Sequence, residues 1–279
     1  MAVVDKPAGV TSHDVVNQLR RHFGEKRIGH AGTLDPGATG VLVVAVGNAT
    51  RLMRFLSGAD KSYVGEIVLG TSTSTLDDAG EVTARFDMSA VTLADARRVV
   101  TEHLVGDIEQ VPPMVSALKV DGRRLHELAR EGIEVERAPR PVHIARFELE
   151  ATDEPGVLRA TIDCSSGTYI RTLADDLGRL LGGAAHLRNL RRTRVGRFTL
   201  EQAQPPDAAT LLPVETAVAH LPAVSVDEAT ADLITHGRLL PAWPGDGPWS
   251  VFAASGELLA VYEMFRSGQA KPAVVLVGA

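Results

Sequence analysis

Helical and extended patterns of apolar residues follow one another along this chain without a fixed alternation. Apolar residues three and four positions apart predict helices over residues 12–23, 48–57, 92–104 and 208–220. Ser12 is suited to cap the first helix and Gly24 to end it. Continuous or alternating apolar residues predict strands over residues 41–46, 63–69 and 157–164. The mixture indicates an α+β fold with a mixed, mainly antiparallel central sheet and flanking helices.

A further helix is expected directly after a turn at Gly167. Its apolar stripe consists of Ile170, Leu173, Leu177, Leu180 and Leu181. Arg171 lies outside this stripe, in the first turn.

Two segments differ from the rest in composition. Residues 105–141 contain four prolines around a charged helix near residues 123–130, which predicts an inserted, mobile segment. Residues 222–279 contain short strand-like runs separated by proline and glycine. The chain is therefore expected to consist of a large domain, residues 1–221, and a small β-rich domain, residues 222–279.

The composition is that of a folded protein without extracellular features. Of 279 residues, 44% are hydrophobic and 23% are charged, which excludes disordered, collagen-like and coiled-coil proteins. Cys164 is the only cysteine, so an intramolecular disulfide and a cysteine-rich zinc site are excluded. The first residues lack the pattern of a signal peptide, and no apolar run reaches the roughly 18 residues of a membrane span. We expect a cytoplasmic protein with no membrane contact.

A glycine-rich loop, residues 29–40, leads into the strand at 41–46. Gly32 and Gly37 have the spacing of a phosphate-binding loop, but Ala38-Thr39 stands where Lys-Ser/Thr is required. A nucleotide cofactor is therefore not expected. The nine histidines form no ligand-like cluster, so a metal is not expected either. The loop does present Asp35 before Pro36, beside glycines that let a ligand approach the main chain. Asp-Pro-Gly alone is also typical of a β-turn in which the aspartate caps its own backbone.

The whole loop resembles the signature loop of the TruB-type tRNA pseudouridine synthases, which modify uridine-55 in the T loop of tRNA. The match reads Gly29-His30-Ala31-Gly32-Thr33-Leu34-Asp35-Pro36-x-Ala38-Thr39-Gly40. Other motifs of that family follow in order: Asp5-Lys6-Pro7-x-Gly9, Lys61-x-Tyr63, Pro112-Pro113-x-x-Ser116-Ala117-x-Lys119, Gly167-Thr168-Tyr169-Ile170-Arg171-Thr172-Leu173 and His186-Leu187-x-x-Leu190-Arg191-Arg192. The resemblance spans most of residues 1–198.

The resemblance implies an isomerase of the bacterial stand-alone form that needs no cofactor. The N1–C1′ bond of uridine is broken, the base is rotated, and C5 is joined to the ribose. Asp35 is then the expected nucleophile, and Arg171 the cation that keeps it ionised. Tyr63 is expected to stack on the flipped uracil, His30 to fill the space that the nucleotide leaves, and Leu190 to line the uracil pocket. By residue type alone, Arg171 would be a surface arginine, Tyr63 a packed strand residue and His30 a structural hydrogen-bonding residue.

The charge of the chain is unevenly distributed. The formal net charge is −6, which by itself argues against a nucleic-acid partner. Residues 198–279 hold three basic and nine acidic side chains and carry all of this excess, whereas residues 1–197 are neutral overall. Residues 186–197 contain five arginines and no acid, which could form either a basic strip for RNA or a solvated face. The expected phosphate-binding residues are Lys6, Lys119, Arg188, Arg191, Arg192, Arg194 and Arg197.

Residues 222–279 resemble, more weakly, the RNA-binding PUA domain that follows the catalytic domain in this family, which would contact the acceptor stem. Three positions depart from the family pattern, which often has Tyr at Val115 and His126 and Lys at Ser166. These departures leave the catalytic motif intact and concern the RNA contacts.

Three other functions remain as alternatives. The protein could act mainly as an RNA-folding factor that binds the tRNA elbow, or as a dyskerin-like synthase with a guide RNA and protein partners. The chain begins almost at its first motif, which favours the stand-alone form, with tRNA bound through its T arm and elbow, no guide RNA, and a monomeric enzyme. A small-molecule isomerase is the least favoured, because it would have no use for the arginine run and the inserted segment.

Overall fold

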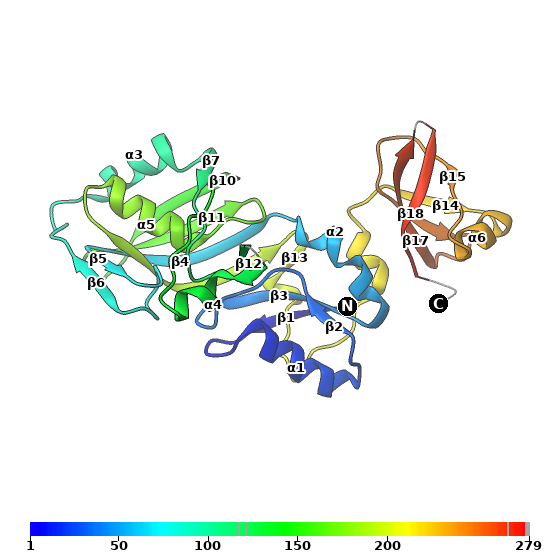
Figure 1. Ribbon diagram of the computed structural model, residues 1–279, viewed down its shortest axis with the longest axis horizontal. Coiled ribbons are helices and arrows are strands. Elements are labelled where there is room, and N and C mark those ends of the chain that lie inside the picture. The colour runs from blue at the N-terminus through cyan, green and yellow to red at the C-terminus, as the bar shows by residue number, and fades with distance from the viewer. Residues whose placement is uncertain (117, 121, 267, 277–279) are drawn as a thin grey trace.

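The computed structural model describes residues 1–116, 118–120, 122–266 and 268–276, and these contain two main sheets (Figure 1). The larger, central sheet has the order β1 (Ala2–Lys6), β3 (Thr39–Val46), β12 (Ala185–Val195), β4 (Lys61–Leu69), β11 (Val157–Cys164), β10 (Arg140–Ala151) and β7 (Gly106–Gln110), with β2 (Ile28–His30) paired to β3 and β13 (Phe198–Thr199) to β12. Its described pairs are antiparallel except for β12 with β3. The expected α+β class with a mixed, mainly antiparallel sheet is confirmed.

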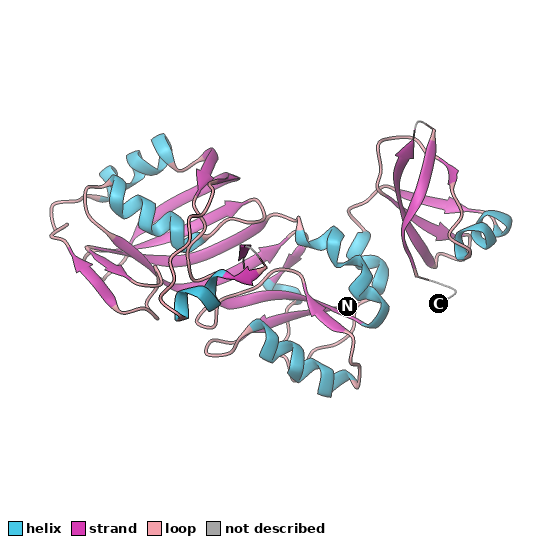
Figure 2. Ribbon diagram, in the orientation of Figure 1, coloured by secondary structure: helices cyan, strands magenta, loops and turns pink. Residues whose placement is uncertain are grey.

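Helices cover the faces of the central sheet, as the two colours of Figure 2 make visible. The described part of the whole chain contains the helices α1 (Ser12–Phe23), α2 (Met53–Ser57), α3 (Leu93–His103), α4 (Leu125–Arg130), α5 (Ile170–Leu180) and α6 (Glu228–Thr235), with 3-10 helices at Gly47–Leu52, Leu200–Gln202 and Val214–Val218. Of these, α6 contacts the smaller sheet. Helices α3 and α5 pack over the half of the sheet formed by β4, β11 and β10, and they bury the largest apolar cluster there. Helix α1 packs against the other half, over β1, β2 and β3.

Helix α1 shows how local sequence sets an element that later positions the site. Thr11, not Ser12, is the N-cap, and it forms a capping box with Asp14. Gly24 ends the helix in the left-handed conformation that glycine adopts without strain. The prediction that Ser12 caps this helix is therefore wrong. Ser12 is buried instead, and its hydroxyl bonds to the glycine-rich loop.

Three further expectations need correction. The inserted segment covers residues 111–139 rather than 105–141, because β7 and the start of β10 pair within the central sheet. It contains α4 and the short strands β8 (Lys119–Val120) and β9 (Arg123–Arg124). The helix expected over residues 208–220 is reduced to the 3-10 turn Val214–Val218, which begins after Pro213. Leu180 is 47% exposed, so the buried stripe of α5 is shorter than the apolar spacing suggests.

The smaller sheet has the order β14 (Ala223–Val226), β16 (Trp249–Ala253), β17 (Leu258–Arg266), β18 (Gln269–Val275) and β15 (Leu240–Pro241), with α6 beside it. A separate hairpin, β5 (Thr71–Thr73) with β6 (Val82–Arg85), follows β4. The small sheet contacts α2 through an ion pair between Arg54 and Glu263, whose side-chain atoms lie 2.6 Å apart. Across the described part of the chain, every helix is too short or too polar to span a membrane.

Candidate active site

The loop that carries Asp35 is held in place by buried side chains of the first strand and the first helix. It connects β2 to β3. The hydroxyl of Ser12 accepts a hydrogen bond from the Leu34 N–H at 2.9 Å and donates one to the Leu34 carbonyl at 3.0 Å. A turn follows in which the Ala38 N–H donates to the carbonyl of Asp35 at 3.1 Å. The Asp-Pro-Gly turn is thus present, and the Asp35 side chain, 42% exposed, reaches outward to Arg171.

Lys6 supports the same loop from inside the protein. Lys6 is completely buried, and its ammonium group donates to the carbonyls of Pro7, Val10 and Pro36 at 2.9, 2.7 and 3.1 Å. Burial lowers the pKa of Lys6 to about 8, although nearby Asp35 partly opposes the shift. The expectation that Lys6 contacts phosphate is contradicted by this burial. Lys6 holds the backbone around Asp35 instead.

Arg192 is a second internal support. It is 1% exposed, and its guanidinium donates to the carbonyls of Val41, Thr33 and Gly32 at 2.7, 3.3 and 3.1 Å. Its three donor directions join β12 to the glycine-rich loop, which suits the planar fork of arginine. The expectation that Arg192 contacts phosphate is therefore also contradicted. A basic residue in a motif of this kind can stabilise a loop as well as bind RNA.

Arg171 joins three segments of the chain at the site. Its Nε lies 2.9 Å from Oδ2 of Asp35. Its Nη1 donates to the carbonyl of Thr75 at 2.6 Å, and its Nη2 donates to the carbonyl of Val115 at 2.8 Å. The side chain is 5% exposed although it lies outside the apolar stripe of α5, because these partners satisfy its donors. The Val115 contact uses the backbone, so it does not depend on the side chain in which this position departs from the family pattern.

A second carboxylate, Asp77, also faces Arg171 and was not singled out by the sequence. Its Oδ2 lies 3.6 Å from Nε of Arg171, while its Oδ1 accepts hydrogen bonds from the Thr75 hydroxyl and the Ala79 N–H. Leu76 between them has φ of 63°, a left-handed conformation that is rare for leucine and frequent at functional sites. The polar run that ends at Gly80, with Asp77 and Asp78 side by side, is the signal that could have indicated this residue.

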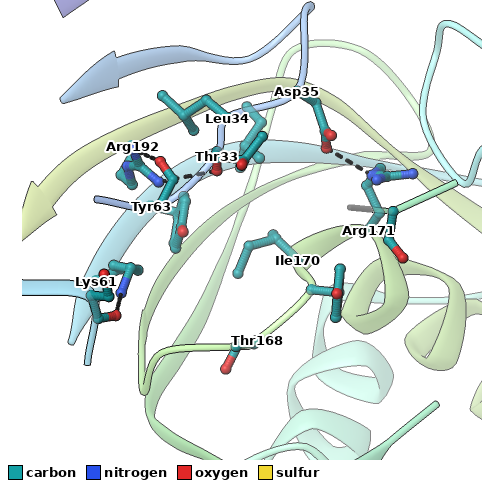
Figure 3. A pocket seen from close by; sticks show the side chains of 15 residues that line it. Thr33, Leu34, Asp35, Lys61, Tyr63, Thr168, Ile170, Arg171 and Arg192 are labelled. Carbon is teal, nitrogen blue, oxygen red and sulfur yellow. Dashed lines mark hydrogen bonds and ion pairs between the residues drawn. The ribbon is translucent and has the colours of Figure 1, made fainter. Parts of the chain in front are cut away.

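A pocket of about 270 Å³ opens beside the Asp35–Arg171 ion pair. Its lining includes residues from five parts of the chain: Thr33, Leu34, Asp35, Lys61, Tyr63, Ser116, Thr168, Tyr169, Ile170, Arg171, Leu190 and Arg192. Figure 3 shows Asp35 and Arg171 at one side of this pocket and Lys61 at the other. The structure thus brings together five of the residues expected from the sequence, Asp35, Tyr63, Arg171, Leu190 and Arg192. A carboxyl group held by an arginine, an aromatic ring and apolar walls are suited to hold a planar base next to a nucleophile.

Two titratable groups of the pocket have strongly altered proton affinities. Burial raises the pKa of Tyr63 above its ordinary value, and the charge of Arg192 nearby opposes this in part. Burial and the charge of Arg192 lower the pKa of Lys61 to about 8. The Lys61 ammonium donates to the carbonyls of Ser57 and Ala59. Tyr63 therefore stays neutral at physiological pH and can contribute its ring and a hydroxyl proton.

The remaining expected residues lie apart from the pocket or are already paired. His30 is half-buried in β2 and is not among the lining residues, and burial lowers the pKa of its imidazole. Arg191 forms a bidentate ion pair with Asp5, at 2.7 and 3.1 Å. Lys119 belongs to β8, but its side chain lies outside the described part of the structure, as do Ala117 and the side chain of His126.

The arginine run of β12 is largely neutralised by acidic residues of β1, β4 and β11 and of the turn between β10 and β11. Arg188 pairs with Glu66 and Glu154, at 2.8 and 2.7 Å, and Arg194 lies 3.5 Å from Asp163. Together with the buried Arg192 and the paired Arg191, this leaves Arg197 as the exposed arginine of the run without an ion pair among the described contacts. The run is therefore not a free basic strip in this structure. Within the described residues, no three His, Cys, Asp or Glu side chains are grouped so that they could hold a metal ion.

Comparison with family models matches three consecutive parts of the chain. Residues 20–170 match the N-terminal domain of the TruB family of pseudouridylate synthases. Residues 171–219 match the C-terminal domain model of tRNA pseudouridylate synthase B, and residues 221–277 match the C-terminal model of tRNA pseudouridine synthase II.

Curated relatives and solved structures agree with these matches. The chain is 46% identical over 272 residues to tRNA pseudouridine synthase B of Mycobacterium sp. (strain KMS), with 94% of this chain and 91% of the relative covered. It is 50% identical over 240 residues to tRNA pseudouridine synthase B of Symbiobacterium thermophilum, with 83% and 80% covered. A chain of a Cbf5-Nop10-Gar1 complex is 27% identical with a TM-score of 0.72, and 96% of this chain and 79% of that chain are covered.

Proposed function

The chain belongs to the TruB family of pseudouridylate synthases, and from this premise we propose that it converts uridine-55 in the T loop of tRNA to pseudouridine, with Asp35 as the nucleophile. The observation that carries the proposal is the 2.9 Å ion pair between Asp35 and Arg171 at the edge of a pocket with apolar and aromatic walls. The half-exposed Asp35 carboxylate is accessible to a nucleotide, whereas the Arg171 guanidinium is buried and is held beside this carboxylate. This pairing keeps the Asp35 carboxylate oriented toward the pocket edge.

The reaction is an isomerisation that needs one well-placed carboxylate. The N1–C1′ bond of the nucleotide breaks, the uracil rotates, and a new C5–C1′ bond forms. C5 loses its proton, and N1 of the product carries one, so no oxidant, reductant or energy source enters the balance. The carboxylate of Asp35 adds to C1′ of the ribose as the N1–C1′ bond breaks, or adds to C6 of the uracil, or assists a glycal route, and it is a free carboxylate again once the C5–C1′ bond has formed. Arg171 acts by holding this carboxylate in position.

The walls of the pocket support a role in holding a flipped base. Tyr63 offers an aromatic ring, and Leu190, Leu34 and Ile170 offer apolar contacts that a uracil ring requires. Since a base within a folded T loop is not accessible in place, the nucleotide must be extruded, at a cost of a few kcal/mol of unstacking. The neutral Tyr63 hydroxyl is a candidate for moving the C5 proton.

The protein is proposed to act alone on the T arm and elbow of tRNA, as a monomer and without a guide RNA. The names of its close relatives support this form, whereas Cbf5 occurs in complexes with Nop10 and Gar1. We assign residues 1–221 to the catalytic domain and residues 222–279 to a PUA-like RNA-binding domain. Most arginines of β12 are paired, so affinity is expected to depend on the shape of the elbow more than on net charge. His30 and Lys119 remain proposed contacts of the RNA.

The test is replacement of Asp35 by asparagine in the full chain. Tritium release from C5-labelled uridine in tRNA should fall below detection, while the tRNA dissociation constant should stay within about threefold. Asp153→Asn is a matched control, because Asp153 is exposed in the turn between β10 and β11. Turnover by Asp35→Asn at a rate near that of Asp153→Asn would rule out Asp35 as nucleophile. Tritium release only from a position other than 55, in otherwise active protein, would rule out the proposed substrate site.

A further inference from the structure

The end of β7 and the segment that follows it support Arg171 at two points, one by direct contact and one through the residue that precedes α5. One is the carbonyl of Val115, which accepts from Nη2 of Arg171 at 2.8 Å. The other is Gln110, the last residue of β7, which is 1% exposed. The Oε1 of Gln110 accepts a hydrogen bond from the Tyr169 N–H at 3.0 Å, and its Nε2 donates to the Tyr169 carbonyl at 3.3 Å. One side chain thus binds both backbone groups of one residue.

Tyr169 is the residue directly before α5. Its backbone is extended, and its own side chain makes no capping hydrogen bond. Its carbonyl also accepts the Leu173 N–H at 3.2 Å, in the first turn of the helix. The amide of Gln110 therefore binds the backbone of the N-cap residue and ties the start of α5 to the end of β7. Arg171 follows two residues later, within the turn whose position this contact sets.

We propose that Gln110 is a positioning residue for the reaction, which acts by holding the first turn of α5 so that Arg171 meets Asp35. The inference rests on the proposed role of Asp35. The guanidinium of Arg171 must meet the Asp35 carboxylate and the carbonyls of Thr75 and Val115 at once. A displacement of the helix start would change all three distances. Since reaction rates depend steeply on sub-ångström placement, loss of this support should slow the chemical step and leave tRNA binding intact.

The proposal depends on the amide group, because one atom must accept and the other must donate. Glutamate at position 110 has the same shape, and in its ionised form it can only accept. Its second oxygen would then face the Tyr169 carbonyl without a proton between them. A protonated carboxyl group can donate there and restores the pattern of glutamine. Burial raises the pKa of such a carboxyl, so lowering the pH favours its protonated, donating form.

The experiment compares Gln110→Glu and Gln110→Leu with the native full chain in single-turnover reactions with saturating enzyme. At pH 8 both variants should be roughly tenfold to a hundredfold slower, with dissociation constants for tRNA within about twofold of the native value. On lowering the pH from 8 to 5.5, the rate of Gln110→Glu relative to native protein should recover at least fivefold, whereas that of Gln110→Leu should stay constant. Thr92→Val is the matched control, because it removes the cap of α3, a helix that packs against α5, and the described side-chain hydrogen bonds of Thr92 are with Asp95.

Circular dichroism at each pH establishes that all variants are folded at the assay temperature. A native rate for Gln110→Leu, or equal pH dependence of the two variants, would overturn the positioning role. Weakened tRNA binding with an unchanged rate at saturation would also overturn it. If the native chain itself forms no pseudouridine, the proposed function fails; if it does and Gln110→Leu equals it, this inference alone fails.

Discussion

Replacing Arg171 by lysine should separate the effect of a positive charge from the effect of its geometry. The guanidinium has Nε 2.9 Å from Asp35 and 3.6 Å from Asp77. Its two terminal nitrogens donate to the carbonyls of Thr75 and Val115, at 2.6 and 2.8 Å. A lysine ammonium is a single point of charge on a flexible stem, so it cannot meet these partners in three fixed directions.

The expected loss follows from the contacts that lysine cannot make. A hydrogen bond that involves a charged group contributes about 1.5–3 kcal/mol. Loss of one such bond in the transition state, about 2 kcal/mol, corresponds to a rate roughly 30-fold lower. Misplacement of the Asp35 carboxylate by ~1 Å adds up to about a hundredfold. We therefore expect the single-turnover rate of Arg171→Lys to fall by between about 30-fold and about 3,000-fold.

The assay is tritium release from C5-labelled uridine in tRNA with enzyme in excess, with tRNA affinity and thermal unfolding measured in parallel. Arg179→Lys is the control, because Arg179 lies on the same helix, is 62% exposed and pairs with Asp175 and Asp176. This control should stay within about twofold of native protein, since exposed ion pairs contribute little. A folded Arg171→Lys variant with a rate within about threefold of native would refute the argument from geometry.

Two further predictions concern Asp77, which lies outside the motifs, and Lys61, to which its motif assigned no role. Asp77→Asn keeps an acceptor for the Ala79 N–H but loses the charge 3.6 Å from Arg171, so the single-turnover rate should fall roughly tenfold with unchanged tRNA affinity; an unchanged rate would show that Asp77 only shapes its loop. For Lys61, the pKa of about 8 in the folded protein lies below the ordinary value of 10.5, so the unfolded chain binds more protons between these values and stability rises with pH. From pH 7 to 9.5 denaturant unfolding should show native protein gaining about 2 kcal/mol relative to Lys61→Met, and a parallel pH dependence of the two would contradict this.

Periodicity determined the elements of this fold better than it determined their ends. The strands at 41–46, 63–69 and 157–164 and the helices at 12–23 and 92–104 are present, because each presents apolar side chains that neighbouring elements bury. The helix predicted over 208–220 is replaced by a short 3-10 helix that begins after Pro213. Proline has no backbone N–H to donate within a helix, and a count of apolar residues does not take this into account. The inserted segment is shorter than its composition suggests, because β7 and the start of β10 pair within the central sheet. This pairing is a long-range contact that local composition does not reveal.

The linear sequence is enough to predict the main residues of the candidate site. They are a carboxylate in a glycine-rich loop, an arginine after a second glycine turn, and a tyrosine on a strand. Only the tertiary structure decided which charges are free to act. Lys6 and Arg192 look like RNA contacts in a linear motif, but both are buried as internal supports of the Asp35 loop. Asp77 and Gln110 look ordinary in the sequence, but folding places them against Arg171 and the residue before its helix. Whether a charged side chain is free to contact RNA depends on its burial and on its hydrogen-bond and ion-pair partners. These partners come from segments far apart along the chain, so only folding brings them together.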